Sequence, residues 1–406
     1  MIYFETYGCP SNKADTEAMK ALLGERVCET EEEADIIIVN SCGVKGQTER
    51  KILKRVSQLC EKKKVIVAGC LPKITERIDI RASLLGINVS DILSVVSEVE
   101  KGNRVVNVAD RRENKVLLQK RFSLITTIPI SEGCLHACTY CATRFARGSL
   151  HSFPKNTIVQ VMRDAYESGA REFHLTGQDV GCWGHDSNET LPDLLSDIEG
   201  MKGDFLIRIG MMHPGSIMNI LDELTDAFMS ERVFKFLHLP IESGSEKVLR
   251  AMGRRYTLQN VSEIVQAFRK KIERLYLCTD IIVGYPTETE EEFKDTLEVI
   301  AHLAPDKVNA TMFSPRPRTA ASRMKDMPDR IKKERSRRLF RLRMDIASQI
   351  NRSYVGKQFS CFIDECGIKR NMGRLPNYKP VLVDGELGEK KVIEIVGFTP
   401  TYLISR

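Results

Sequence analysis

The chain has 406 residues, of which 42% are hydrophobic and 29% are charged, and its formal net charge is +6. That apolar fraction with so small a net charge excludes a mostly disordered chain, and the length predicts two or three domains of about 150 residues each. No apolar run reaches the ~18 residues of a membrane helix, and the N-terminus lacks the basic and apolar regions of a signal peptide. We therefore expect a cytoplasmic protein with no membrane span.

Residues 1–100 are predicted to form an α/β domain with a parallel sheet. Short apolar strands alternate there with helical patterns at about 12–24 and 45–62. Apolar runs between helices are typical of strands that are covered on both faces. The expected strands are 2–4, 36–39 and 65–68.

A cysteine follows each of these three strands, at Cys9, Cys42 and Cys70. In an open α/β sheet, the carboxyl ends of the strands line the ligand crevice. One βα repeat separates each cysteine from the next, so we expect the three thiols to converge on a shared ligand.

Residues 101–122 are polar with little periodicity, and we interpret them as an interdomain linker. Residues 123–323 then repeat a strand and a helix about six times, with helical patterns such as 157–168 and 288–303. Six units fit a partial (βα)6 barrel, in which the chemistry lies at the C-terminal ends of the strands. The expected strands are 123–130, 171–176, 206–211, 234–241, 275–283 and 307–313.

Residues 324–352 are predicted to be a basic helical linker, because eight of the 14 residues from Arg330 to Arg343 are lysine or arginine. Such a run is either a solvated face or a contact for an RNA backbone, and its density favours RNA. Residues 353–406 change to short strands separated by turns. They predict a small β-barrel of a kind that often binds oligonucleotides, with strands at 359–363, 379–383 and 391–396.

The 12 cysteines are the most unusual feature of the composition. In a large chain without an export signal, clustered cysteines favour metal or redox chemistry over disulfides. The sharpest cluster is Cys134, Cys138 and Cys141, a C-x3-C-x2-C pattern after the first expected barrel strand. Iron–sulfur clusters are normally held by four thiolates, so three would leave one iron open to substrate. A zinc site that adds His136, and disulfide bonds, are the alternatives.

This spacing, with the aromatic Tyr140 before the last cysteine, resembles the radical S-adenosylmethionine (SAM) enzymes. The segments 6–9, 40–42 and 68–70 resemble the N-terminal domain of methylthiotransferases, and the tail resembles the RNA-binding TRAM barrel. The Tyr-Gly-Cys-Pro-Ser-Asn sequence at 7–12 departs from the commoner Gly-Cys-Gln-x-Asn pattern, which we expect to change the surroundings of the cysteine without removing its role.

The resemblance implies two 4Fe–4S clusters. Cys134, Cys138 and Cys141 would hold the first, whose open iron binds SAM for reductive cleavage to a 5′-deoxyadenosyl radical. The remaining triplet, Cys9, Cys42 and Cys70, would hold a second cluster that presents sulfur for insertion. A low-potential electron donor and a sulfur source are the further partners that this chemistry requires.

Five further residues are candidates for SAM contacts. Gln178, Ser243 and Asp280 lie at expected strand ends, and Arg208 is placed to meet a carboxylate. Tyr140 would pack on the adenine. Ordinary strand-end hydrogen bonds or packing are the alternatives for these residues.

The other six cysteines have no matching spacing, and we expect them to be small buried hydrophobic residues. Cys182 is the one considered for a redox or ligand role, because it follows Gln178 beside the only tryptophan, Trp183.

The segments 134–141 and 146–150 resemble most closely the archaeal and eukaryotic tRNA methylthiotransferases of threonylcarbamoyladenosine. This implies 2-methylthiolation of N6-threonylcarbamoyladenosine next to the anticodon (position 37), with the anticodon stem-loop of tRNA as partner. The alternatives are isopentenyl-adenosine of tRNA, an aspartate of a ribosomal protein, or a non-catalytic iron–sulfur protein that binds RNA or acts as a sensor.

Overall fold

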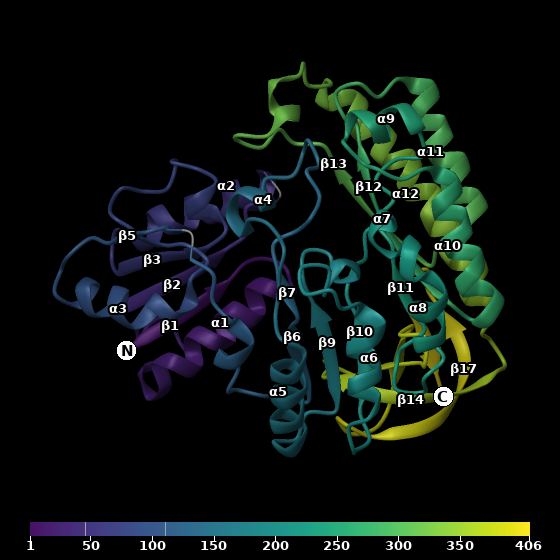
Figure 1. Cartoon of the computed structure of the whole chain (residues 1–406), viewed down its shortest axis with the longest axis horizontal. Helices are drawn as coiled ribbons and strands as arrows, with labels where there is room; N and C mark the ends of the chain where they lie inside the picture. Colours follow the sequence, from purple (N-terminus) through teal and green to yellow (C-terminus); the bar gives the residue numbers. More distant parts are fainter. Residues whose placement is uncertain (45, 110) are drawn as a thin grey trace.

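The computed structural model describes residues 1–44, 46–109 and 111–406. Lys45, where we expect the second helix to begin, and Asp110, inside the expected linker, lie outside the described residues. Figure 1 shows an N-terminal α/β part on the left, a central barrel of strands with helices outside it, and a small C-terminal barrel beneath.

The N-terminal part is a five-stranded parallel sheet in the order β1-β2-β3-β4-β5. Alternate residues of β2 enter two separate cores: Ile36 and Ile38 belong to one, and Ile37 and Val39 to the other. Both faces are therefore covered, as predicted. The strands are β1 (Ile2–Thr6), β2 (Ile36–Ser41), β3 (Lys64–Gly69), β4 (Ser83–Leu85) and β5 (Val106–Asn107), and the helices are α1 (Pro10–Leu23), α2 (Gly46–Leu59) and α3 (Ile92–Glu100).

The expected linker at 101–122 is part of this packing and not a simple connection. It contributes β5 and the 3₁₀ helix η4 (Lys115–Leu118), which contacts α1 and α5. Lys115 and Val116 of η4 are buried. Two residues of strand and one turn of helix are too short to produce a periodic pattern, which is why the sequence does not reveal them.

The centre is an open barrel of six parallel strands, as predicted. Two three-stranded sheets, β6-β9-β10 and β11-β12-β13, are joined by the parallel bridges Ile207–Val233 and Met211–His238. The strands are β6 (Ile125–Pro129), β9 (Glu172–Thr176), β10 (Leu206–Ile209), β11 (Phe236–His238), β12 (Tyr276–Val283) and β13 (Lys307–Met312), with a hairpin of β7 (Ser131–Glu132) and β8 (His151–Ser152) after β6.

Helices cover the outside of this barrel (Figure 1). The largest hydrophobic core lies between them and the strands. The helices are α4 (Thr143–Arg147), α5 (Lys155–Glu167), α6 (Leu191–Glu199), α7 (Pro214–Ile217), α8 (Leu221–Ala227), α9 (Glu246–Ala251), α10 (Leu258–Lys271) and α11 (Glu290–Leu303).

The basic stretch forms a single long helix, α12 (Asp329–Arg352), that packs on α11 and β13. Part of its charge is internal, contrary to the expected RNA-contacting surface. Lys332 and Arg335 are buried, and Arg335 pairs with Glu288 at 2.7 Å. Arg337 and Arg341 remain exposed. The sequence could not separate the buried basic residues from the exposed ones, because they differ only in which face of the helix they occupy.

The tail is a closed barrel in the order β14-β15-β16-β18-β17. Three of its strands match the predicted ones, while β15 and β18 have no clear alternation in sequence. The barrel lies at the amino ends of the central strands, where the Lys235 amide donates to the Pro376 carbonyl at 2.9 Å and Asn377 donates to the Arg274 carbonyl at 3.0 Å. The strands are β14 (Gln358–Glu365), β15 (Asn371–Arg374), β16 (Pro380–Val383), β17 (Lys390–Phe398) and β18 (Leu403–Ser405).

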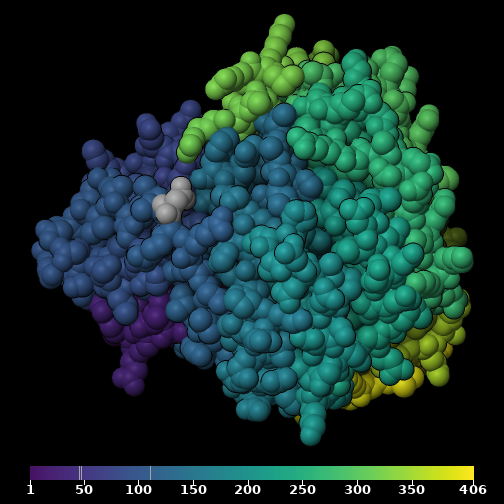
Figure 2. Space-filling view, viewed as in Figure 1, coloured from purple at the N-terminus to yellow at the C-terminus, as the bar shows by residue number. Residues whose placement is uncertain are grey.

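The segment after β13 connects the central barrel to the N-terminal part. Figure 2 shows this yellow-green segment at the top of the molecule, above the N-terminal residues. Arg316 forms a buried ion pair with Glu49, and Arg318 donates to the Lys73 carbonyl at 3.3 Å. Within the described residues, no helix combines the length and apolarity that crossing a membrane requires.

Candidate active site at the two cysteine triplets

The first triplet lies at the carboxyl ends of β1, β2 and β3, where the pattern places it. Cys9 is the N-cap residue of α1, Cys42 directly follows β2, and Cys70 directly follows β3. Cys9 is exposed, and the other two are buried. All cysteines are free thiols, so the disulfide alternative is wrong.

Buried amides fix the loops that carry these thiols. Asn12 donates to the side chain of Asn40 at 3.0 Å, and Asn40 donates back to the Asn12 carbonyl at 2.7 Å. Gly8 has φ +146°, and a Cβ there would lie 2.9 Å from the Cβ of Cys42. The close approach explains why the chain needs glycine immediately before Cys9.

Burial controls the ionisation of two thiols of the first triplet, Cys42 and Cys70. It raises the pKa of Cys42 to about 11, and the neighbouring Cys70 and Cys9 raise it further, while the Val44 amide lowers it. Burial likewise raises the pKa of Cys70. These thiols are therefore protonated at neutral pH, and a metal cluster that binds them releases the protons.

The second triplet lies in the loop between β7 and α4. Gly133 begins this loop with φ +78°, and a Cβ there would lie 2.1 Å from the Ser149 carbonyl oxygen. Gln178 accepts from the Gly133 amide at 2.6 Å and donates to Ser11 at 3.3 Å. The predicted SAM contact Gln178 thus lies between the two triplets and holds the loop of the second. Burial raises the pKa of Cys134 to about 12.

His136 is engaged away from the cysteines. Its Nε2 lies 2.8 Å from the Ser216 hydroxyl and 3.3 Å from an Asp179 carboxylate oxygen. Its ring stacks on His213 with 3.6 Å between centroids. Among the described residues, no three His, Cys, Asp or Glu side chains are arranged as ligands of a single metal ion. His136 is therefore not placed as a fourth ligand beside the cysteines. The three thiols of the loop stay the predicted ligands of a 4Fe–4S cluster.

A buried polar group adjoins the second triplet. The Tyr140 hydroxyl donates to Glu242 at 3.0 Å, and Arg254 lies 3.8 Å from the Cys138 sulfur. Burial raises the pKa of Glu242 to about 7, although Arg254 lowers it. Sequence reasoning missed Glu242. The available signal in the sequence was its position directly after the Pro-Ile that follows β11. In the structure its backbone has a positive φ of 69°.

Asp280 on β12 belongs to the same group. One carboxylate oxygen lies 2.8 Å from His238 Nε2, and the other accepts from Asn309 at 2.8 Å. Burial alone would lower the pKa of His238, but Cys278 and Asp280 raise it to about 10. The pair of His238 and Asp280 thus lies close enough to Glu242 to change its pKa.

Three other residues that the sequence indicated make their contacts away from this group of side chains. Ser243 is fully buried, accepts from the Ser245 amide at 3.2 Å, and contacts Thr296 of α11. The Arg208 guanidinium lies 5.0 Å from the ring of Tyr378 in the C-terminal barrel, so it points toward the amino ends of the strands. The Cys182 thiol donates to the Asp179 carbonyl at 3.0 Å and is buried. The position of a residue near a strand end does not determine where its side chain points, so the sequence could not predict these contacts.

A cavity of about 230 Å³ opens beside the second triplet. Its lining includes Cys138, Cys141 and three arginines: Arg144, Arg318 and Arg323. All three arginines are exposed. The cavity beside the cysteine loop is therefore lined by positive charge.

Residues 128–300 match the radical SAM superfamily, and residues 1–84 match a family described as uncharacterized protein family UPF0004. The probable threonylcarbamoyladenosine tRNA methylthiotransferase of Pyrococcus abyssi is 44% identical over 99% of this chain and 98% of its own length. The chain belongs to the threonylcarbamoyladenosine tRNA methylthiotransferase family. The protein of this family from Archaeoglobus fulgidus is 40% identical over 100% of the chain and 98% of its own length, and the human protein is 33% identical over 84% of the chain and 62% of its own length.

Solved radical SAM structures share the fold of this family member. The methyltransferase TsrM from Kitasatospora setae superposes with a TM-score of 0.58 and 13% identity, covering 79% of this chain and 74% of its own. The cobalamin-dependent enzyme OxsB gives 0.54 and 12% identity, covering 85% and 56%. The chain is thus a radical SAM methylthiotransferase, and its cofactors include SAM and a 4Fe–4S cluster.

Proposed function

We propose that this enzyme converts N6-threonylcarbamoyladenosine next to the anticodon of tRNA, at position 37, into its 2-methylthio derivative. The observation that carries the proposal is full-length similarity to relatives named for this substrate, in a chain whose two thiol triplets lie on adjoining loops. When bound, SAM and the clusters supply the radical, the sulfur and the methyl group. The residues of the chain bind, orient and shield these groups.

Cys134, Cys138 and Cys141 are proposed to hold the SAM-binding cluster, and Cys9, Cys42 and Cys70 a second 4Fe–4S cluster. Each triplet offers three thiols, and a 4Fe–4S cluster held by three cysteines leaves one iron for a small molecule. The second-cluster proposal is supported by the placement of Cys9, Cys42 and Cys70 at three adjacent strand ends.

We propose that SAM lies over the group formed by Tyr140, Glu242, His238 and Asp280. These side chains offer a donor and acceptors at the end of β11, in the loop that follows it and on β12. Arg254, whose charge acts on Glu242, lies beside Cys138. Gln178 would hold the cluster loop against the N-terminal part. Ser243 and Arg208 would act through packing, because their contacts face α11 and the C-terminal barrel.

The anticodon stem-loop of tRNA is the proposed macromolecular partner. The C-terminal barrel and the exposed Arg337 and Arg341 of α12 offer a positive surface for its backbone. The target adenosine has to be unstacked to reach a barrel interior. With tRNA as its substrate, we propose that the enzyme acts in the cytoplasm.

A low-potential electron donor and a sulfur source complete the proposal. The donor is expected to approach through the cavity beside Cys138 and Cys141, because its arginines attract an acidic protein. Reversing Arg144 and Arg323 to glutamate should slow SAM cleavage with an acidic protein reductant and leave cleavage with dithionite unchanged. Equal rates with both reductants would contradict this route.

The central experiment is nucleoside mass spectrometry of tRNA treated anaerobically with cluster-loaded enzyme, SAM and a reductant. A methylthio mass gain on threonylcarbamoyladenosine is expected. A gain only on isopentenyl-adenosine, or on a ribosomal-protein aspartate, would reassign the substrate. Production of 5′-deoxyadenosine by the loaded enzyme would exclude a non-catalytic iron–sulfur protein.

Two cysteine variants separate the clusters. Cys134→Ala should abolish SAM cleavage, because its loop loses one of three thiolates. Cys42→Ala should abolish methylthiolation and retain some SAM cleavage. Unchanged product formation by Cys42→Ala would refute the second cluster.

A further inference from the structure

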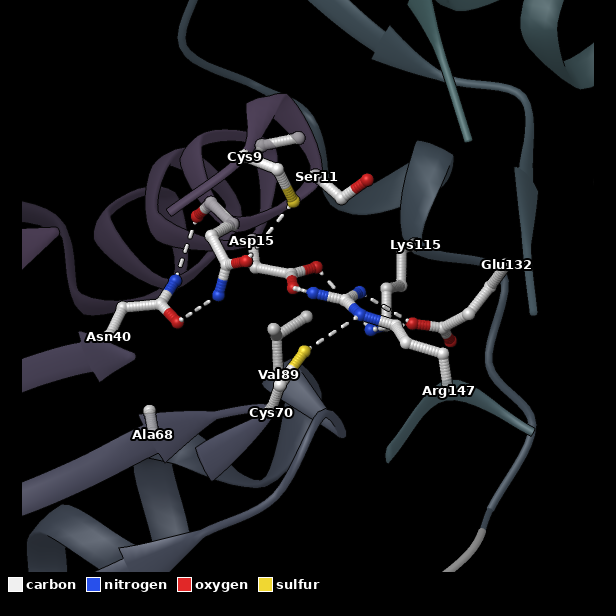
Figure 3. Close-up of polar contacts among 12 residues, drawn as sticks. Cys9, Ser11, Asp15, Asn40, Ala68, Cys70, Val89, Lys115, Glu132 and Arg147 are labelled. Carbon is white, nitrogen blue, oxygen red and sulfur yellow. Dashed lines mark hydrogen bonds and ion pairs between the residues drawn. The ribbon is translucent and has the colours of Figure 1, made fainter. Parts of the chain in front are cut away.

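Four buried charged residues connect the N-terminal part to the central barrel (Figure 3). Asp15 comes from α1, Lys115 from η4, Glu132 from β7 and Arg147 from α4. Arg147 pairs with Asp15 and with Glu132, both at 2.7 Å, and Lys115 pairs with the same two acids at 3.3 and 2.6 Å. We call these four residues the charge quartet.

The charge quartet is balanced, with two cations and two anions, and every member is buried. Buried ions need such complete pairing, because an unpaired charge in the interior is strongly destabilising. Taken alone, the quartet would be no more than a connection between two parts of the chain. One contact goes beyond this role.

Arg147 also donates from Nε to the Cys70 sulfur at 3.4 Å. Its two terminal nitrogens bind the carboxylates, which leaves Nε directed at the thiol, as Figure 3 shows. Lys115 contacts the same acids, and none of its hydrogen bonds reaches a sulfur. The two cations of the quartet therefore differ in a single respect, the contact with Cys70.

Arg147 is also tied to the other triplet. It ends α4, the helix that begins two residues after Cys141. Cys70 and Ile74 form a small buried cluster with Ala142 and Ala146 of the same segment. The helix that follows one cluster loop thus packs directly on a ligand of the other.

We infer that Arg147 is a positioning residue for the second cluster, which it serves by donating a hydrogen bond to the ligand sulfur of Cys70. Hydrogen bonds to ligand sulfurs and nearby charge set the reduction potentials of iron–sulfur clusters. A cationic donor favours the reduced, more negative state. Arg147 therefore raises the potential of the cluster at Cys9, Cys42 and Cys70. The inference rests on the proposed second cluster.

The test uses a parent in which Cys134, Cys138 and Cys141 are all alanine, so that only the second cluster binds. Arg147→Gln and Lys115→Met are introduced separately, and midpoint potentials are measured by redox titration with dithionite under EPR detection. Arg147→Gln should shift the midpoint to a more negative potential, and by clearly more than Lys115→Met, which removes a cation of the same quartet but no hydrogen bond to sulfur. A tenfold fall in the ratio of reduced to oxidised cluster at fixed potential corresponds to about 59 mV.

The outcomes separate the possibilities. Equal shifts in both variants would show a general effect of the charge quartet and overturn the inference, as would no shift in Arg147→Gln. If Arg147→Gln does not retain iron, Arg147→Lys keeps the charge and loses the Nε donor, and an unchanged midpoint there overturns the inference. A parent that binds no cluster would instead refute the proposed second cluster.

Discussion

One buried ion pair joins the C-terminal barrel to the central barrel. Lys379 Nζ lies 2.6 Å from Asp306 Oδ1, and the two side chains are 3% and 4% exposed. Lys379 also donates to Asn351 of α12 at 2.6 Å, and Asp306 accepts from the Leu277 amide at 3.0 Å. The pair thus joins the tail, the long helix and the central strands at one point.

Lys379→Met removes the cation and leaves Asp306 buried without its ion partner. Breaking a buried pair in this way costs about 3–5 kcal/mol. Because 1.4 kcal/mol is a factor of ten, the undocked population should rise by between about 10²-fold and about 4 × 10³-fold. The double variant Lys379→Met/Asp306→Asn should recover most of the loss, because no charge is then left buried.

Amide hydrogen exchange of strands β14–β18 measures this local opening directly. Faster exchange confined to these strands in the single variant, and near-normal exchange in the double variant, is the expected pattern. If the single variant exchanges like the unmodified enzyme, or if the double variant opens as readily as the single one, the reasoning is wrong.

Three further predictions follow from other contacts. Gly133→Ala should lower the iron content and visible absorbance of the loaded enzyme, because the new Cβ meets a backbone carbonyl at 2.1 Å; Gly102→Ala, with φ +89° and open space around it, is the control for strain alone. Burial raises the pKa of Asp364 to about 6, so this carboxyl is more basic in the folded state than in the unfolded state. Its contribution to the free energy of unfolding is therefore present below about pH 4. As the pH rises to 6, the protein loses up to about 3 kcal/mol of this free energy. Asp364→Asn should remove this part of the pH dependence, which is measured by urea unfolding. Arg337→Gln and Arg341→Gln should each lower the salt dependence of tRNA binding by about 0.7–0.9 in the slope of log K against log salt, and an unchanged slope would place the RNA elsewhere.

The sequence predicted the features that repeat or that depend on strand ends. Buried strands between helices placed Cys9, Cys42 and Cys70 on one edge, and the six central strands lie where the alternation indicated. These predictions succeed because the direction of a parallel strand fixes where its carboxyl end lies.

What failed depended on side-chain direction or on tertiary contacts. Ser243 follows an expected strand and Arg208 lies within one, but their side chains contact α11 and the C-terminal barrel. Arg335 could not be told from Arg337 without knowing which face of α12 packs inward. The strand β5 is too short to leave a pattern, and Glu242 gained its place from a left-handed turn that no periodicity reveals.

The three thiols of the first triplet differ in their exposure to solvent. Cys9 is open to solvent at the start of α1, whereas Cys42 and Cys70 are enclosed behind it. Reagents in solution therefore reach the Cys9 thiol before the other two. In the protein without bound metal, a thiol-modifying reagent should label Cys9 first and Cys42 and Cys70 only after local opening.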